Sequence, residues 1–172
     1  HLHELSWGRD PRSVVPHEVE KSVSNEHTFS NDVDDPTVIR AELTALSDKV
    51  AARLRKAGYK GKTVTVKLRF ADFTTITRSK TGAYTDLSHE IYATVWKLYE
   101  ALGLQRVRIR LVGVKVDGLL AAGEAPDQLL FGEPEHGRRD AELAIDTLRD
   151  KFGPGAVRPA RTVTGSPETP NE

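Results

Sequence analysis

Basic side chains occur at every second position in two short stretches of this sequence. Lys67 and Arg69 alternate with apolar residues, as do Arg108 and Arg110, and Lys115 follows a few residues later. In an extended strand this spacing places basic side chains on one face and apolar side chains on the other. Arginine and lysine gathered on one face can neutralise the phosphates of a nucleic acid. We therefore predict that these five residues bind a polyanion through one face of a β-sheet.

The formal charge of the chain is zero, but the charges are unevenly distributed. Residues 60–116 hold 11 basic and 4 acidic side chains, a net charge of +7, whereas residues 1–59 carry −2 and residues 117–172 carry −5. A concentrated cationic segment is typical of a polyanion-binding surface, although an ordinary solvated face can have the same composition. Cations gathered on one uncovered sheet face would repel one another unless a polyanion meets them, which favours the binding surface.

Composition excludes several classes of protein. The 172 residues contain no cysteine, which excludes disulfides, thiolate zinc sites and cysteine nucleophiles. No apolar run approaches the ~20 residues that span a bilayer, and no leader peptide opens the chain, so we expect a cytoplasmic protein without membrane contact. The chain also lacks methionine. We interpret it as a monomeric fragment of a longer protein that begins within a domain at His1.

The remaining candidates for catalysis or metal binding have simpler explanations. Asp32, Asp34 and Asp35 could form a metal site, but a turn followed by a helix N-cap accounts for them. His27 fits a strand, and His89 fits the first turn of a helix. The sequence contains no nucleophile–histidine–carboxylate arrangement and no phosphate-binding glycine loop, so we predict no catalytic residue, no metal site and no cofactor in this chain.

Three helices are predicted from apolar residues at intervals of three and four. The first has Asp35 as its N-cap and Pro36 as its first residue, and it ends at Gly58. The second covers residues 87–102 and ends at Gly103. A shorter one covers residues 138–152.

Four strands are predicted, over residues 22–29, 63–70, 74–80 and 106–116, with a turn at 31–35 and a loop at 81–86. In the last strand the apolar phase changes near Gly113, so we predict a β-bulge there, which keeps Lys115 on the face of Arg108 and Arg110. The order β-α-β-β-α-β over residues 21–119 predicts an α+β domain. Its four-stranded, mostly antiparallel sheet carries two helices on one face, and a tether and a short helix follow.

Several segments, in their order along the chain, resemble one protein family. They are Lys21-Ser22-Val23-Ser24, Val66-Lys67-Leu68-Arg69-Phe70, Thr77-Arg78-Ser79-Lys80-Thr81 and Arg110-Leu111-Val112-Gly113-Val114-Lys115. Together they resemble the little finger, the C-terminal DNA-binding domain of Y-family DNA polymerases, of the bacterial DNA polymerase IV (DinB) type. The resemblance covers residues 1–119, and residues 138–157 are similar to the C-terminal extensions of some members.

The resemblance implies a domain that lies in the major groove of primer–template duplex DNA. It implies that residues 1–10 end the thumb domain, 11–20 form a linker, and 21–119 form the little finger. Residues 120–137 would be a flexible tether, 138–157 a C-terminal helix, and 158–172 a disordered tail. The palm domain, with its catalytic carboxylates and Mg²⁺, would lie upstream. This piece of an error-prone translesion polymerase should therefore bind DNA and the remaining polymerase domains without polymerising.

The resemblance also assigns DNA-binding positions. The matching residues are Ser22, Ser24, Arg78, Lys80, Arg110 and Lys115, whereas Lys67, Arg69 and Arg108 are added from strand alternation alone. Many members have a basic residue where this chain has Asn25, so no contact is carried over to that position. About six phosphate contacts predict a log–log salt dependence of affinity near −5, since each contributes roughly −0.9.

A second motif lies between the predicted sheet and the last helix. Gln128-Leu129-Leu130-Phe131 resembles the peptide by which polymerases bind a sliding clamp, whose usual form, Gln-Leu-x-Leu-Phe, is one residue longer. In such a peptide the glutamine anchors to polar groups, and the leucine and phenylalanine fill an apolar pocket. An apolar cluster in a segment rich in glycine, proline and acid is otherwise poorly placed. We predict that it binds the clamp; packing of the cluster on this chain is the alternative.

Two other functions remain open. A single-strand RNA-binding domain can have the same element order, but such domains stack bases on aromatic residues of the central strands. The predicted open face has no aromatic residue, and Tyr92, Trp96 and Tyr99 fit packing of the second helix better. The other alternative is an interaction module that docks a clamp or polymerase without binding DNA. Competition between duplex and single-stranded oligonucleotides would separate these functions.

Overall fold

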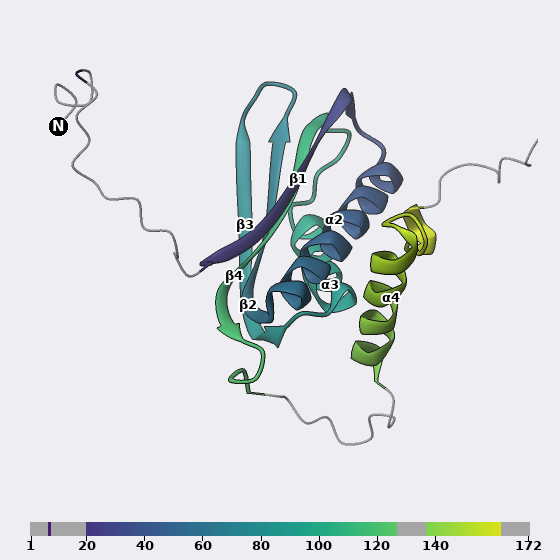
Figure 1. Cartoon of the computed structure of the whole chain (residues 1–172). Helices are drawn as coiled ribbons and strands as arrows, with labels where there is room; N and C mark the ends of the chain where they lie inside the picture. The colour runs from purple at the N-terminus through teal and green to yellow at the C-terminus, as the bar shows by residue number, and fades with distance from the viewer. Residues whose placement is uncertain (1–6, 8–19, 127–136, 163–172) are drawn as a thin grey trace, which may run out of the picture.

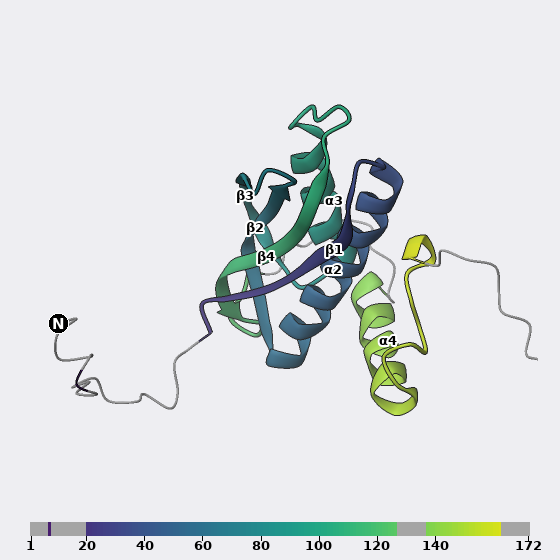
Figure 2. The ribbon, with the colours of Figure 1, turned by 90° about the horizontal axis from the view of Figure 1, so that it is seen from above.

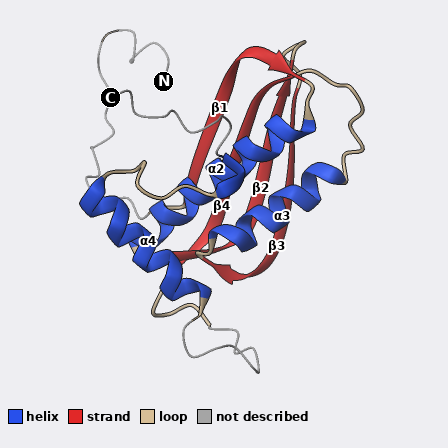
Figure 3. Cartoon of the chain, turned by 90° about the vertical axis from the view of Figure 1, so that its right-hand side faces the viewer, coloured by secondary structure: helices blue, strands red, loops and turns tan. Residues whose placement is uncertain are grey.

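The described part of the chain folds as four strands and two helices in the predicted order, followed by a third helix. The computed structural model describes Trp7 and residues 20–126 and 137–162. The elements are β1 (Ser22–Val33), α2 (Pro36–Ala57), β2 (Tyr59–Phe70), β3 (Thr75–Thr85), α3 (Ser88–Glu100), β4 (Ile109–Ala121), α4 (Arg138–Phe152) and the short 3-10 helix η1 (Ala160–Thr162). The sheet order is β1-β4-β2-β3, and all neighbouring strands are antiparallel (Figure 1). Helices α2 and α3 lie side by side on one face of the sheet (Figure 3). The predicted α+β class is confirmed.

Helix α2 begins and ends where its capping residues predict. The side chain of Asp35 accepts a hydrogen bond from the Thr37 backbone N–H at 2.8 Å, and Pro36 occupies the first turn, where its missing N–H costs nothing. At the other end Gly58 adopts a left-handed conformation with φ of 73° and donates to the carbonyls of Leu54 and Arg55. Local capping thus defines this helix.

The hydrophobic core lies between the two helices and one face of the sheet. It is formed by Ile39, Leu43, Leu46, Val50 and Leu54 of α2, Ile91 and Val95 of α3, and Val23, Val64, Val66, Leu68, Ile109, Val112, Val114 and Val116 of the strands. Burying one such side chain contributes roughly 1.5–3 kcal/mol. Because these strand positions must face the helices, the alternating positions face away from them.

The strands are longer than predicted, and β4 also starts later. Strand β1 continues to Val33 through the predicted turn, and β3 continues to Thr85, so the predicted loop at 81–86 is wrong. Strand β4 begins at Ile109 and runs on to Ala121, into the segment predicted as a tether. These extensions pair with neighbouring strands, as in Thr81 with Thr63. A neighbouring strand that forms hydrogen bonds with the backbone N–H and C=O groups can hold glycine- and threonine-rich segments in a sheet, although their local sequence pattern is weak.

The change of side-chain phase in β4 occurs at Arg110. Gly113 pairs in regular register with both neighbouring strands, so the bulge predicted there is wrong. Ile109 and Leu111 pair with consecutive residues of β2, which leaves Arg110 as the extra residue. Consequently Ile109 belongs to the core, whereas Leu111 faces the opposite side of the sheet and is not part of that cluster.

Helix α4 lies beside α2 on the side away from the sheet (Figures 1 and 2). Ion pairs connect the two helices. Arg55 of α2, with only 2% of its side chain exposed, pairs with Glu142 and Asp146 of α4. Arg149 pairs with Asp48 at 2.8 Å. Burial opposes the charge of Arg55, but the hydrogen bond to Asp146 and the charges of Glu142, Asp146 and nearby Asp86 outweigh it. They hold the Arg55 pKa above its ordinary value.

Candidate nucleic-acid interface

No helix among the described residues covers the second face of the sheet, which we call the open face. By strand register it consists of Ser22, Ser24, Glu26 and Thr28 of β1, Leu111, Gly113, Lys115 and Asp117 of β4, Thr63, Thr65, Lys67 and Arg69 of β2, and Thr75, Thr77, Ser79 and Thr81 of β3. Side-chain contacts agree with this assignment, since Thr65 Oγ1 lies 2.8 Å from Ser79 Oγ. The open face is therefore a surface of hydroxyls and charges.

Five of the predicted DNA-binding residues come together on the open face. Ser22 and Ser24 lie on β1, Lys115 on β4, and Lys67 and Arg69 on β2. Ser24 pairs directly with Lys115 in the register. The prediction that Lys67, Arg69 and Lys115 share one face is confirmed, although Lys67 and Lys115 are 48 residues apart in sequence. Arg108 and Arg110, which were predicted to share this face, are not among its paired positions.

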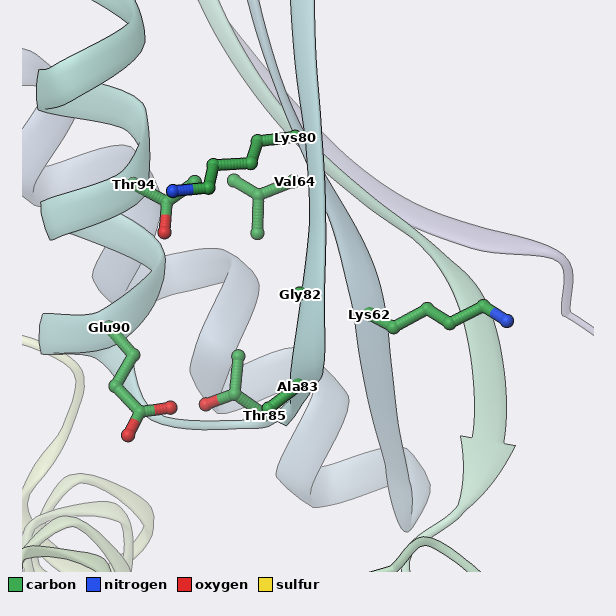
Figure 4. Close-up of a pocket in the computed structure, with 8 residues that line it drawn as sticks. All are labelled: Lys62, Val64, Lys80, Gly82, Ala83, Thr85, Glu90 and Thr94. Carbon is green, nitrogen blue, oxygen red and sulfur yellow. The ribbon is translucent and has the colours of Figure 1, made fainter. Parts of the chain in front are cut away.

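Arg78 and Lys80 lie on the other side of β3. They pair with Val66 and Val64, which face the core, so their side chains leave the sheet on the helix side. Figure 4 shows Lys80 directed toward Thr94 of α3. Both side chains are exposed because β3 is an edge strand that α3 covers incompletely. These two residues were assigned by the resemblance and not by alternation.

Arg108 and Arg110 lie at one end of the sheet. Arg110 occupies the bulge, where its Nε lies 2.9 Å from Asp32 Oδ1 and its guanidinium lies 4.4 Å from the centre of the Phe73 ring. Arg108 precedes the first residue of β4, so strand alternation does not apply to it, and its carbonyl accepts a hydrogen bond from the Ala71 N–H. The hydrogen bond from Arg110 holds the pKa of Asp32 below its ordinary value of 3.8; burial opposes this effect, and the charges of Arg110 and Arg108 add to it.

Carboxylates of the same chain accompany two of the three cations on the open face. Lys67 Nζ lies 2.8 Å from Glu26 Oε1, and Lys115 Nζ lies 3.0 Å from Asp117 Oδ2. Arg69 donates to the hydroxyl of Thr75, and no described carboxylate lies within ion-pair distance of it. The expectation that these cations repel one another until a polyanion arrives is therefore corrected. Glu26 and Asp117 also belong to this face, and they neutralise their neighbours.

The other polar candidates have structural roles in the described residues. Asp35 caps α2 and Asp32 binds Arg110, and no group of three or more acidic, histidine or cysteine side chains in residues 20–126 and 137–162 could hold a metal ion. His27 lies 3.7 Å from Glu42, and His89 lies 3.8 Å from Glu142. None of the described helices combines the length and the apolar character needed to cross a bilayer.

The aromatic residues of α3 stack on one another rather than on the open face. Ring centroids lie 6.4 Å apart for Tyr92 and Trp96 and 5.1 Å apart for Trp96 and Tyr99. Trp96 and Tyr99 pack against the core, and burial raises the pKa of Tyr99. The predicted role in helix packing is confirmed. Sequence reasoning missed the Tyr92 hydroxyl, which accepts hydrogen bonds from Arg40 of α2 and Arg161 of η1.

A small pocket lies on the helix side of the sheet, between β3 and α3 (Figure 4). Its volume is about 180 Å³, and it is lined by Lys62, Val64, Lys80, Gly82, Ala83, Thr85, Glu90 and Thr94. Small-molecule sites usually measure roughly 300–1,000 Å³. The open face is therefore the better candidate for function.

Three predicted segments lie outside the described residues. They are the proposed thumb remnant and linker (except Trp7 and Glu20), the clamp-binding motif Gln128-Leu129-Leu130-Phe131, and most of the C-terminal tail. The short helix η1 falls within the segment predicted as a disordered tail.

The fold and the site define an α+β domain whose sheet carries two helices on one face and exposes hydroxyls and charged side chains on the other. Residues 20–130 match the family model described as the impB/mucB/samB family C-terminal domain. DNA polymerase IV of Desulfatibacillum aliphaticivorans is 36% identical over 166 residues, which are 95% of this chain and 42% of that protein.

Two solved structures are also similar. A Y-family DNA polymerase chimera, Dbh-Dpo4(243-245)-Dbh, has a TM-score of 0.54 at 20% identity, over 69% of this chain and 34% of that one, and it supports the fold. The complex of the β-clamp processivity factor and the little finger domain of PolIV has a TM-score of 0.49 at 25% identity, over 64% of this chain and 98% of that one.

The chain belongs to the impB/mucB/samB C-terminal domain family, as a little finger domain of the Y-family polymerases, of the DNA polymerase IV type. It spans about 40% of the length of the curated relatives that it matches.

Proposed function

We propose that this domain holds the primer–template duplex of a translesion DNA polymerase, with the open face along the phosphate backbone in the major groove. The observation that carries the proposal is the placement of Lys67, Arg69 and Lys115 with Ser22 and Ser24 on one uncovered face. Cations neutralise phosphates, and hydroxyls and exposed strand-edge amides can donate to phosphate oxygens. The contacts would position the duplex without reading its sequence.

The composition of the open face favours duplex over single-stranded nucleic acid. Apart from Leu111 and Gly113, its register positions carry serine, threonine and charged residues, and none carries an aromatic side chain. Binding of single strands draws much of its energy from bases stacked on aromatic rings. This face lacks such a platform.

The remaining cations extend the proposed surface at its margins. Arg78 and Lys80 project from the edge strand β3, so we assign them to the part of the DNA phosphate backbone that would pass along this edge of the sheet. At the end of the sheet Arg110 lies beside Phe73, and the charge of Arg108 acts on Asp32. We assign both arginines to the same duplex further along its axis. These assignments follow from the length and the positive charge of the four side chains.

We further propose that the chain is one domain of a polymerase whose catalytic site, with Mg²⁺, lies in a separate palm domain. We also propose that this polymerase acts on the chromosome in the cytoplasm. The family membership and the DNA polymerase IV relatives support this placement. A second contact would be the sliding clamp, through Gln128, Leu129, Leu130 and Phe131. The sequence pattern supports this contact, as does the position of the motif in the segment that links β4 to α4.

The test is duplex binding measured by fluorescence anisotropy at several salt concentrations. The variant K67A/R69A/K115A should lose about tenfold or more in affinity at low salt, and its log–log salt slope should become shallower by up to about 2.7, roughly 0.9 for each lost phosphate contact. The matched control is K49A/K56A/K97A, which removes three exposed cations from α2 and α3. Equal losses in both triple variants would refute the open face as the binding surface.

The alternatives predict different competition. A single-stranded oligonucleotide of equal length should compete more weakly than the duplex for the wild-type domain. Stronger competition by the single strand would favour an RNA-binding type of module. Clamp binding without measurable duplex affinity would favour a pure interaction module.

A further inference from the structure

Glu26 and Lys67 form an ion pair that passes over a third strand. In the register, Glu26 of β1 and Lys67 of β2 both pair with Gly113 of β4, which lies between them. Neighbouring strands are about 4.8 Å apart, so this pair bridges two strand spacings. The Nζ–Oε1 distance of 2.8 Å shows that the two side chains meet above β4.

Gly113 leaves room for this bridge. A Cβ atom at this position would lie 2.9 Å from Glu26 Cγ, closer than carbon atoms approach. Any larger residue would project from the open face into the path of the glutamate. The backbone of Gly113 does not need glycine for its own conformation, because its φ is not positive. The glycine therefore serves the approach of Glu26.

The pair occupies the centre of the surface to which DNA is assigned. In the neighbouring row, Lys115 pairs with Asp117 of its own strand. Among the described residues, Arg69 beyond Lys67 has only the hydroxyl of Thr75 as a partner. The side chains of Lys67 and Glu26 are 31% and 41% exposed, so a phosphate can reach the ammonium group. An exposed ion pair is weak enough for another anion to displace its carboxylate.

We propose that Glu26, reaching across Gly113, competes with DNA phosphate for Lys67 and thereby sets the affinity of this face below what its cations allow. The inference rests on the proposed function, since it concerns the regulation of the same surface. A phosphate that contacts Lys67 has to replace the carboxylate and then lies beside an uncompensated negative charge. Removing the carboxylate makes Lys67 available and removes that repulsion.

The experiment compares duplex affinity for wild type and Glu26→Gln. Glu26→Gln should tighten binding about threefold to fivefold at low salt. It should also steepen the salt slope by up to about 0.9, because Lys67, which Glu26 occupies for part of the time in wild type, then contacts phosphate fully. Glu100→Gln, at the exposed end of α3, makes the same change in net charge on the helix side and should leave affinity nearly unchanged. Equal gains in both variants would overturn the inference, because net charge alone would then explain them.

Two further backgrounds test the mechanism. Lys67→Ala should abolish the gain from Glu26→Gln, and a full gain without Lys67 would overturn the competition. In a Gly113→Ala background the gain should shrink, because the added methyl group already displaces Glu26; an undiminished gain would show that Glu26 does not act across β4. If the folded wild-type domain binds no duplex at all, the proposed function itself fails, which is a different result from wild-type binding that Glu26→Gln leaves unchanged.

Discussion

Glu142 of α4 caps the N-terminus of α3 at Ser88. Its carboxylate accepts hydrogen bonds from the Ser88 backbone N–H at 3.0 Å and from the Ser88 hydroxyl at 2.6 Å. The residue at the N-cap position of α3 is Leu87, whose side chain makes no capping hydrogen bond. A carboxylate 54 residues later in the chain therefore supplies the cap and meets the positive end of the helix dipole.

Replacing Glu142 should destabilise the domain. Glu142→Ala removes the cap of α3 and one partner of the buried Arg55, so we expect the free energy of unfolding to fall by about 1–3 kcal/mol. Urea unfolding followed by circular dichroism measures it. Asp150→Asn, an exposed acid on the same helix, is the control and should change stability little. Equal effects would contradict a capping role for Glu142.

The Asp32–Arg110 pair should make stability depend on pH in the acidic range. Since the folded-state pKa of Asp32 is lowered from 3.8, its contribution to stability is complete above that value and is lost as pH falls through the folded-state pKa. The melting temperature of Asp32→Asn should therefore lie below that of wild type at pH 7, and the difference should shrink below about pH 4.

Asp34→Asn is the control for this pH dependence, because no ion pair of Asp34 occurs in the described part of the chain. Its difference from wild type should be small at pH 7. A difference between wild type and Asp32→Asn that stays constant from pH 7 to pH 3 would contradict the lowered pKa.

Gly61 of β2 should tolerate no side chain. An added Cβ would overlap Val116 of the core and touch Leu119, so Gly61→Ala should destabilise the domain by about 1–3 kcal/mol through overpacking. Gly82→Ala on β3 is the matched control, because nothing lies within 4 Å of the added atom and its φ is not positive. Thermal unfolding of both variants checks the prediction, and a Gly82→Ala variant that loses as much stability would argue against it.

Removing the apolar residues of the clamp motif should abolish clamp binding without affecting DNA affinity. In L130A/F131A the leucine and phenylalanine that would fill the clamp pocket are absent, so we expect at least a tenfold loss in clamp affinity by surface plasmon resonance. L143A/F152A removes the same residue types from exposed positions of α4 and should bind normally. Unchanged clamp affinity in L130A/F131A would exclude the motif.

The helices and the element order were predictable because their signals are local. Asp35, Pro36 and Gly58 define α2 by capping alone. The alternation of Lys67 and Arg69 with core residues also placed them correctly on the open face, because side-chain direction in a strand follows from sequence position. Much of the candidate site was therefore within reach of the sequence.

The tertiary structure decided where strands end, where the bulge lies and which charges meet. Arg110 rather than Gly113 is the extra residue of β4, because register depends on hydrogen bonds to two other strands. Glu26 finds Lys67 across β4, and Glu142 finds Ser88, over separations of 41 and 54 residues. Local periodicity contains no information on contacts between residues so far apart in the sequence. The sequence by itself determined the elements and the faces of their residues, whereas the charge partners arise only when the sheet and helices pack.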